Sequence, residues 1–136
     1  MINFTIIIGI IVGIAGFIIL ISLINFYMSI MPPKMGGITT PDALRLKYEN
    51  ISFETSDGLK LKGWFIPNNK SREIIIVGHG YPFSKSDVLG FAPFLHKHYN
   101  LLFFDFRYFG ESEGAYTSVG WKEQEDLKAA VKYLKS

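Results

Sequence analysis

The first 33 residues of this 136-residue chain carry no charged side chain, because every lysine, arginine, aspartate and glutamate lies at or after Lys34. Residues 4–30 form an apolar run of 27 positions, interrupted only by four hydroxyl or amide side chains and three glycines. Roughly 20 apolar residues in a helix cross the hydrocarbon core of a bilayer, since each residue rises about 1.5 Å. Residues 1–30 are therefore predicted to be a transmembrane helix, which Pro32 and Pro33 terminate.

Two other interpretations of the apolar run are a cleaved signal peptide and a buried core helix. A signal peptide has a basic segment, a shorter apolar core and small residues at its cleavage site, and residues 1–33 match none of these features. A core helix that is apolar all round must be enclosed by protein, and the 103 residues that follow (136 minus 33) are too few to enclose it. We therefore expect a retained, single-pass anchor in the lipid bilayer.

Two further features concern the orientation and the association of this anchor. Lys34, Arg45 and Lys47 follow the apolar run while no basic residue precedes it, which favours a cytosolic C-terminal domain. Gly9 and Gly13 form a GxxxG pattern, which lets two transmembrane helices approach closely. The sequence thus predicts a face for helix–helix dimerisation on the anchor.

The composition excludes several classes of function. The formal net charge is only +2, and no run of lysine or arginine supports binding to nucleic acid. The chain has no cysteine, which rules out disulfides, a thiolate nucleophile, cysteine-ligated zinc and iron–sulfur clusters. His96 and His98 would lie about 200° apart around a helix and so would not share a metal ion. Neither a metal nor a cofactor is predicted.

After a predicted linker over residues 31–47, the sequence indicates a β-hairpin. Its strands are residues 48–55 and 59–67, the second of which alternates between polar and apolar side chains over most of its length. The dipeptide Asp57-Gly58 between them predicts a two-residue turn in which both residues have positive φ angles. The hairpin is expected to open the folded domain.

The rest of the chain alternates strands and helices. Residues 73–80 and 100–106 contain unbroken apolar runs, typical of strands buried on both faces of a parallel sheet. A helix is predicted after each strand, over 86–98 and 120–135. Their apolar stripes are Val88, Phe91, Phe94 and Leu95 in the first and Trp121, Leu127, Val131 and Leu134 in the second. A hairpin followed by strand–helix–strand–helix is an α/β pattern.

The candidate site is the turn His79-Gly80-Tyr81 at the end of the first of these strands. In open α/β folds, ligands and catalytic groups gather at the carboxyl ends of parallel strands. Gly80 permits an unusual backbone turn, and the amide after it could point outward as the donor of an oxyanion hole. The alternative is a structural turn in which His79 bonds only the nearby backbone.

Ser112 completes a literal G-x-S-x-G match over residues 110–114, yet its context argues against a nucleophile. A nucleophile elbow places the serine directly between a strand and a helix, whereas several residues separate this motif from both. Its two flanking glutamates would also oppose a developing oxyanion. We predict a structural loop in which Asp105 and Arg107 pair with each other. A catalytic acid at Asp105 is the alternative.

These motifs together resemble the first half of α/β-hydrolase proteins, in particular the membrane-anchored, serine-peptidase-like and lysophospholipase-like members. The likeness covers about residues 48–136 and is carried by the sequences VGHGY, FFDFRYFGESEG and WKEQEDLKAAVKYL. It implies that the amide of Tyr81, beside His79 and Gly80, helps form the oxyanion hole. It also implies a structural role for the loop that contains Asp105, Arg107, Gly110, Ser112 and Gly114.

The resemblance further implies a domain that is incomplete as an enzyme. In this family the nucleophilic serine, the acid and the histidine come later than the segment that ends here at Ser136, so none of them is assigned. The expected fold class is α/β: an N-terminal transmembrane helix, then over 48–136 the first part of an α/β-hydrolase fold.

The predicted function is the membrane-anchored portion of a serine hydrolase that acts on ester, lipid or peptide bonds. Whether the chain alone is an enzyme stays open, and a second chain could supply the missing half. The alternative is a non-catalytic, membrane-tethered interaction module or a fragment without a function of its own.

Overall fold

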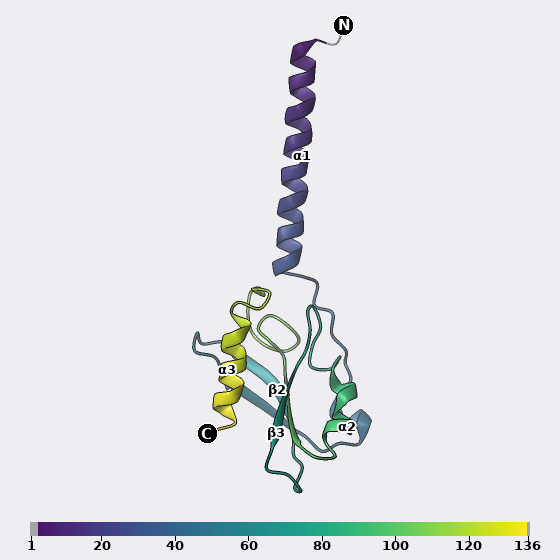
Figure 1. The fold of residues 1–136 in the computed structure, drawn as a ribbon, viewed down its shortest axis with the longest axis vertical. Helices are drawn as coiled ribbons and strands as arrows, with labels where there is room; N and C mark the ends of the chain where they lie inside the picture. The colour runs from purple at the N-terminus through teal and green to yellow at the C-terminus, as the bar shows by residue number, and fades with distance from the viewer. Residues whose placement is uncertain (1–2, 136) are drawn as a thin grey trace. The chain divides into compact units, whose positions relative to one another are not determined.

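The computed structural model describes residues 3–135, which form two compact units that meet in the sequence between Pro32 and Pro33 (Figure 1). The first unit is helix α1, Phe4–Ile30, capped at its start by the Asn3 side chain. No residue of α1 is buried within the structure. The helix is long and apolar enough to cross a bilayer, a criterion that a signal sequence near the N-terminus also meets.

The polar side chains in the second half of α1 are accommodated within the helix itself. Ser22, Asn25 and Ser29 each donate a 2.8 Å hydrogen bond to the carbonyl oxygen four residues earlier. Such bonds satisfy polar groups without water, as an apolar surrounding requires. Hydroxyl and amide side chains are therefore compatible with an otherwise apolar helix.

The second unit is built on a four-stranded sheet in the order β1-β2-β4-β3. Its strands are β1 Glu49–Glu54, β2 Lys60–Ile66, β3 Ile74–Gly78 and β4 Asn100–Phe104. β2 pairs antiparallel with both β1 and β4, and β3 pairs parallel with β4. The strand prediction is confirmed in each case, with ends that differ by no more than two residues.

The core lies on both faces of this sheet, and β4 contributes to both. Leu102 and Phe104 point to one face, and Leu101 and Phe103 point to the other, with no exposed surface on any of them. Helix α3, Glu123–Tyr133, packs on the first face, and the short helices η2, Leu89–Phe91, and α2, Ala92–Leu95, pack on the second (Figure 1). An unbroken apolar run is what a central strand covered on both faces requires.

β3 does not fit the prediction of a strand buried on both faces. It lies at the edge of the sheet, and none of its residues is buried, with Ile74 exposed to 37%. Its sequence is as apolar as that of β4, so hydrophobicity alone did not distinguish a central strand from an edge strand.

The predicted helix over 86–98 is wrong in length, and only Val88 and Leu95 of its predicted apolar stripe pack against the core. Only the single turns η2 and α2 form there, with Pro93 in the first turn of α2. Leu89 and Ala92 are buried, whereas Phe91 and Phe94 are exposed to 61% and 72%. The chain before Leu89 is held in a loop by side-chain bonds, so a continuous amphipathic helix never begins.

Helix α3 lies within the predicted range, but only part of the predicted apolar stripe packs on the sheet. Leu134 packs against the core together with Tyr133 and the buried Ala129 and Ala130. Leu127, Val131 and Trp121, which precedes the helix, are exposed. Three of the four stripe residues therefore lie toward the outside of the described structure.

The hairpin turn differs from the two-residue turn predicted at Asp57-Gly58. Five residues, 55–59, separate the paired residues Glu54 and Lys60. Gly58 has a φ of 83°, whereas Asp57 keeps a negative φ. The turn is closed by a hydrogen bond from the Gly58 amide to the Thr55 carbonyl. The predicted linker over 31–47 contains a 3-10 turn, η1, Pro41–Leu44.

Candidate functional site

The turn after β3 holds its histidine in one orientation. His79 directly follows the last residue of β3, is only 7% exposed, and lies edge-on to the rings of Phe106 and Phe109. The Phe106 amide donates a 3.0 Å hydrogen bond to Nε2 of His79. Nε2 therefore carries no proton, so Nδ1 must be the protonated nitrogen of the neutral ring. Burial lowers the pKa of His79 and so favours this neutral form.

The protonated ring nitrogen of His79 fixes the next peptide bond. Nδ1 donates to the carbonyl oxygen of Gly80 at 2.9 Å, and the Phe83 amide donates to the same oxygen at 2.9 Å. In a planar trans peptide the N–H points opposite to the C=O. The two bonds to Gly80 therefore also fix the direction of the Tyr81 N–H. The peptide bond that follows, between Tyr81 and Pro82, is cis.

A cavity of about 280 Å³ lies beside this turn. Its apolar surface comes largely from aromatic side chains of the turn and of the loop after β4. The lining residues are His79, Gly80, Tyr81, Phe106, Phe109, Thr117, Val119, Gly120 and Glu123. The cavity thus brings the predicted turn together with a loop about 30 residues later.

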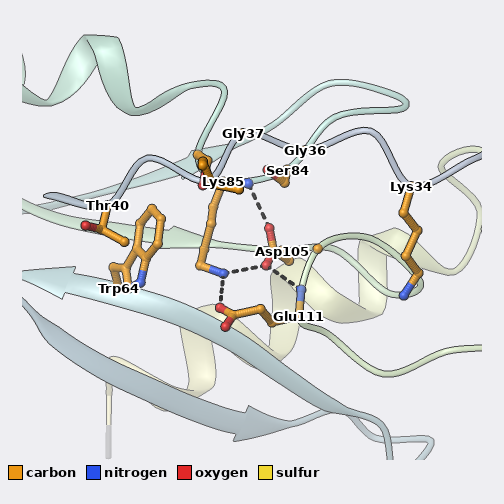
Figure 2. Close-up of a pocket in the computed structure, with 12 residues that line it drawn as sticks. Lys34, Gly36, Gly37, Thr40, Trp64, Ser84, Lys85, Asp105 and Glu111 are labelled. Carbon is orange, nitrogen blue, oxygen red and sulfur yellow. Dashed lines mark hydrogen bonds and ion pairs between the residues drawn. The ribbon is translucent and has the colours of Figure 1, made fainter. Parts of the chain in front are cut away.

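The loop after the turn is bound to the end of β4 by a buried ion pair. Lys85 Nζ lies 2.6 Å from Asp105 Oδ2, and the Lys85 amide donates to Asp105 Oδ1 at 2.7 Å (Figure 2). Lys85 Nζ also pairs with Glu111 and lies 4.7 Å from the centre of the Trp64 ring. These contacts satisfy an ammonium group that would otherwise destabilise the folded state by its burial.

The predicted pairing of Asp105 with Arg107 is wrong. Arg107 donates instead to Asp126, at 2.7 Å from Nη2, and to Asp57, at 2.8 Å from Nη1. Positions two apart along an extended chain point to the same side, but Arg107, three residues past the end of β4, already lies in a turn, so the two side chains diverge. The hydrogen bond from Arg107 is the main cause that lowers the pKa of Asp57 to about 2.

The Ser112 hydroxyl is buried between two backbone groups. Its Oγ donates to the Asp105 carbonyl at 2.6 Å and accepts from the Lys62 amide at 2.9 Å. With both partners in the main chain, Ser112 connects the end of β4 with β2. Ser112 therefore stabilises the loop through these two hydrogen bonds to the backbone.

The two glycines of the same motif are required because no larger side chain fits at their positions. A Cβ at Gly110 would lie 2.2 Å from the Asp105 carboxylate, and one at Gly114 would lie 2.6 Å from the Tyr108 amide. Both glycines also have positive φ angles, 50° and 133°. The G-x-S-x-G spacing here therefore meets the needs of a tight loop.

The sequence analysis missed Lys85 and Glu123. Glu123 accepts bonds from Thr117 Oγ1, from the Ser118 amide and hydroxyl, and from the Gly120 amide. Burial raises its pKa, but the hydrogen bonds from Ser118 and Thr117 outweigh burial and lower the pKa to about 2. The residue three positions before Glu123 is Gly120, so the Ser/Thr-x-x-Glu pattern of a capping box does not mark it. Nothing local in the sequence marks Lys85.

The described residues contain no group of three or more histidine, aspartate and glutamate side chains placed to hold a metal ion. His96 Nε2 lies 2.8 Å from the Pro67 carbonyl oxygen, which ties it to the backbone.

Known proteins resemble this chain in sequence and in fold. The esterase Pf2001 of Pyrococcus furiosus is 42% identical, with a TM-score of 0.70, over 76% of this chain and 42% of that one. The α/β hydrolase GrgF of Penicillium sp. sh18 is 27% identical, with a TM-score of 0.60, over 67% of this chain and 33% of that one. No protein-family model matches the chain.

Curated proteins also match. The uncharacterized protein YfhR of Salmonella typhimurium is 36% identical over 108 residues, which are 75% of this chain and 35% of YfhR. YqkD of Bacillus subtilis, also uncharacterized, is 32% identical over 80 residues, 58% of this chain and 26% of YqkD. This chain spans about a quarter to a third of the length of these relatives. The solved structures support a relationship to the α/β-hydrolase superfamily.

Proposed function

We propose that residues 48–136 are the N-terminal part of the catalytic domain of a serine hydrolase, which acts on ester, lipid or peptide bonds. One observation carries the proposal: the Gly80–Tyr81 peptide is held by two hydrogen bonds at the carboxyl end of β3. It is supported by the 42% identity to a solved esterase. In this function the Tyr81 amide donates to the oxyanion that forms during acyl transfer.

His79 and Gly80 have different parts in this oxyanion hole. Gly80 supplies the turn, and His79 acts on its carbonyl, so that the amide is already oriented before a substrate arrives. A donor fixed in advance needs no reorganisation during the reaction, which is the source of its catalytic benefit. The loop with Asp105, Arg107, Gly110, Ser112 and Gly114 supports the turn from the adjacent strand.

In this proposal the serine nucleophile, the acid and the histidine are supplied by polypeptide outside residues 1–136. A second chain or segment would place a strand along β3, which within residues 3–135 pairs with β4 alone. The cavity beside Tyr81 lies just past the end of that same strand and is lined by His79 and Gly80, which follow it. A serine that followed the added strand would thus come close to the Tyr81 amide.

Helix α1 is proposed as the membrane anchor of this hydrolase, with the folded unit on the cytosolic side. Support comes from its 27 apolar residues and from the basic residues that follow it. Gly9 and Gly13 remain the proposed contact for helix–helix dimerisation.

Reconstitution tests the function. The chain is expressed together with the part of esterase Pf2001 that lies beyond the matched 42% of its length. We expect hydrolysis of p-nitrophenyl esters and labelling of the added serine by a fluorophosphonate probe, with neither signal from the chain alone. A chain that folds with its partner but gives no hydrolysis would refute the proposal.

A matched variant tests the assignment of Ser112 in the same assay. Ser112→Ala should leave the probe labelling on the added polypeptide, because the hydroxyl bonds only backbone groups. Labelling of the 136-residue chain that disappears in Ser112→Ala would instead place the nucleophile there.

A further inference from the structure

The first residues of the second unit pack against the loop that follows the turn His79-Gly80-Tyr81. We propose that residues 33–40, the strap, are a positioning element of the site: they hold the loop 83–87 and thereby fix the Tyr81 amide. The catalytic consequence of this inference rests on the proposed function, whereas the packing and the coupling do not.

Two glycines let the strap approach the loop. A Cβ at Gly36 would lie 2.9 Å from Ser84 Oγ and 3.1 Å from Ser84 Cβ. A Cβ at Gly37 would lie 3.1 Å from Ser86 Cβ. Neither glycine has a positive φ angle, so the requirement for glycine is one of space. Contacts this close show that the strap lies against the loop over two consecutive residues (Figure 2).

The strap is also fixed on both sides of these glycines. Lys34 Nζ lies 5.2 Å from the centre of the Tyr108 ring, in the loop after β4. The Gly37 amide donates a 3.4 Å hydrogen bond to Asp87 Oδ2, and Pro41 at the far end is fully buried. A segment that is exposed along most of its length is thus attached to the folded unit at several points.

The loop transmits this contact to the turn. Asp87 Oδ2, which the strap contacts, also accepts from the Ser84 amide at 2.8 Å and from its hydroxyl at 2.9 Å. One residue earlier, the Phe83 amide donates to the Gly80 carbonyl, the group that fixes the Tyr81 N–H. Hydrogen bonds therefore connect Gly37 through Asp87 to Ser84, and the backbone from Ser84 to its neighbour Phe83 continues the connection to the turn.

The Lys85–Asp105 pair fixes the other side of the same loop. Lys85 lies between the strap and β4, and a cavity of about 420 Å³ bounded by strap, loop and Glu111 surrounds the pair (Figure 2). The loop 83–87 thus contacts the strap on one side and Asp105 on the other. Without the strap, only the contact with Asp105 would hold the loop.

The first experiment tests the contact in the full chain in membranes. Because the chain has no cysteine, the double variant Gly37→Cys, Ser86→Cys introduces the only thiols. The two Cβ positions are near the separation of about 3.5–4.5 Å that a disulfide needs. We expect a disulfide under mild oxidation, seen as a mobility shift that reductant reverses.

The control pair for the disulfide is Gly37→Cys, Ser71→Cys. Ser71 precedes β3, whose five residues separate it from the turn by about 16 Å. No disulfide should form in this pair. Equal yields in the two pairs, or none in the first, would overturn the strap contact.

The second experiment tests the coupling, by hydrogen–deuterium exchange in the full chain. Gly37→Ala should speed exchange roughly tenfold in peptides that cover residues 79–87, with little change in β4. Ser86→Gly added to Gly37→Ala removes the clashing Cβ and should restore the exchange rate to within about twofold. Gly90→Ala is the matched control, because a Cβ there meets no atom within 4 Å.

The outcomes separate a positioning role from general destabilisation. Faster exchange throughout the sheet, or no rescue by Ser86→Gly, would refute the coupling even if the disulfide forms. Both experiments work without catalysis, so a failed reconstitution of hydrolysis leaves their result intact. Conversely, evidence that the strap does not contact the loop would not affect the proposed hydrolase function.

Discussion

α1 and β3 are both uncharged and neither contains a buried residue, yet they pose different physical problems. Every interior backbone group of α1 is bonded within its own helix, so lipid alone can cover its surface. β3 pairs with β4 on one side only among the described residues, and its other edge keeps donors and acceptors that lipid cannot satisfy. The two apolar regions therefore have different requirements: lipid alone can cover the surface of α1, whereas the edge of β3 needs a hydrogen-bonding partner.

The largest expected effect is on the retention of the chain in the membrane by α1. Replacement of both Ile14 and Leu20 by lysine puts two charges near the middle of α1, each costing about 2.5–3.5 kcal/mol in a bilayer. The wild-type chain should stay in the membrane pellet through carbonate and high-salt washes, and the double variant should appear largely in the supernatant. Ile14→Leu, Leu20→Ile is the control and should behave as wild type.

The second prediction concerns the open edge of β3. Residues 31–136 expressed without α1 should form oligomers or aggregates, because an uncharged edge strand pairs with other chains. Ile74→Lys puts a charge on that edge at a position already 37% exposed, and should raise the monomer share severalfold in size-exclusion chromatography with light scattering. Asn69→Lys adds the same charge in an exposed loop before the strand. An equal gain from both variants would mean that net charge alone causes the effect.

The third prediction compares two residues of similar size that pair in register. Leu102→Ala in β4 should lower the free energy of unfolding by about 2–5 kcal/mol, because its side chain is fully buried. Ile76→Ala in β3 should cost only about 1 kcal/mol, because its side chain is half-buried. Fluorescence of Trp64 during urea unfolding of the full chain in nanodiscs measures both. If a bound partner strand covers β3, the cost at Ile76 should rise toward that at Leu102.

The sequence predicted the elements well and their environments less well. The charge-free run, the hairpin and the apolar strands follow from local patterns, and each appears in the structure. Whether β3 is central or at an edge depends on which strands lie beside it, which its own residues do not encode. The helix predicted over 86–98 failed for a similar reason, since contacts with residues 37 and 105 hold that chain as a loop.

At the candidate site, too, some features were predicted from local sequence and others were not. The turn at His79 and Gly80 was predicted, because strand ends and glycines mark such turns locally. Lys85 was missed, since its burial depends on Asp105 and Glu111, 20 and 26 residues away. Asp105 and Arg107 were assigned to each other because they are close in sequence, whereas each has its partner on another element. Charge pairing across a fold is the part that composition and spacing do not reveal.

The smallest expected effect concerns the end of β3, where an edge strand passes into a fixed turn. Burial lowers the pKa of His79, so the folded state binds fewer protons than the unfolded state as pH falls below about 6.5. Stability contributed by the neutral ring is thus complete above that pH and is lost as pH falls toward the folded-state pKa, with a slope of at most about 1.4 kcal/mol per pH unit. Protonation at Nε2 also removes the acceptor for the Phe106 amide, so the loss should be local to the turn.

Urea unfolding between pH 5 and 8 should show this slope in the wild type and lack it in His79→Gln, while His98→Gln, at an exposed position, should retain it. A slope that survives in His79→Gln would mean that another group titrates, and that the turn is held by its backbone alone.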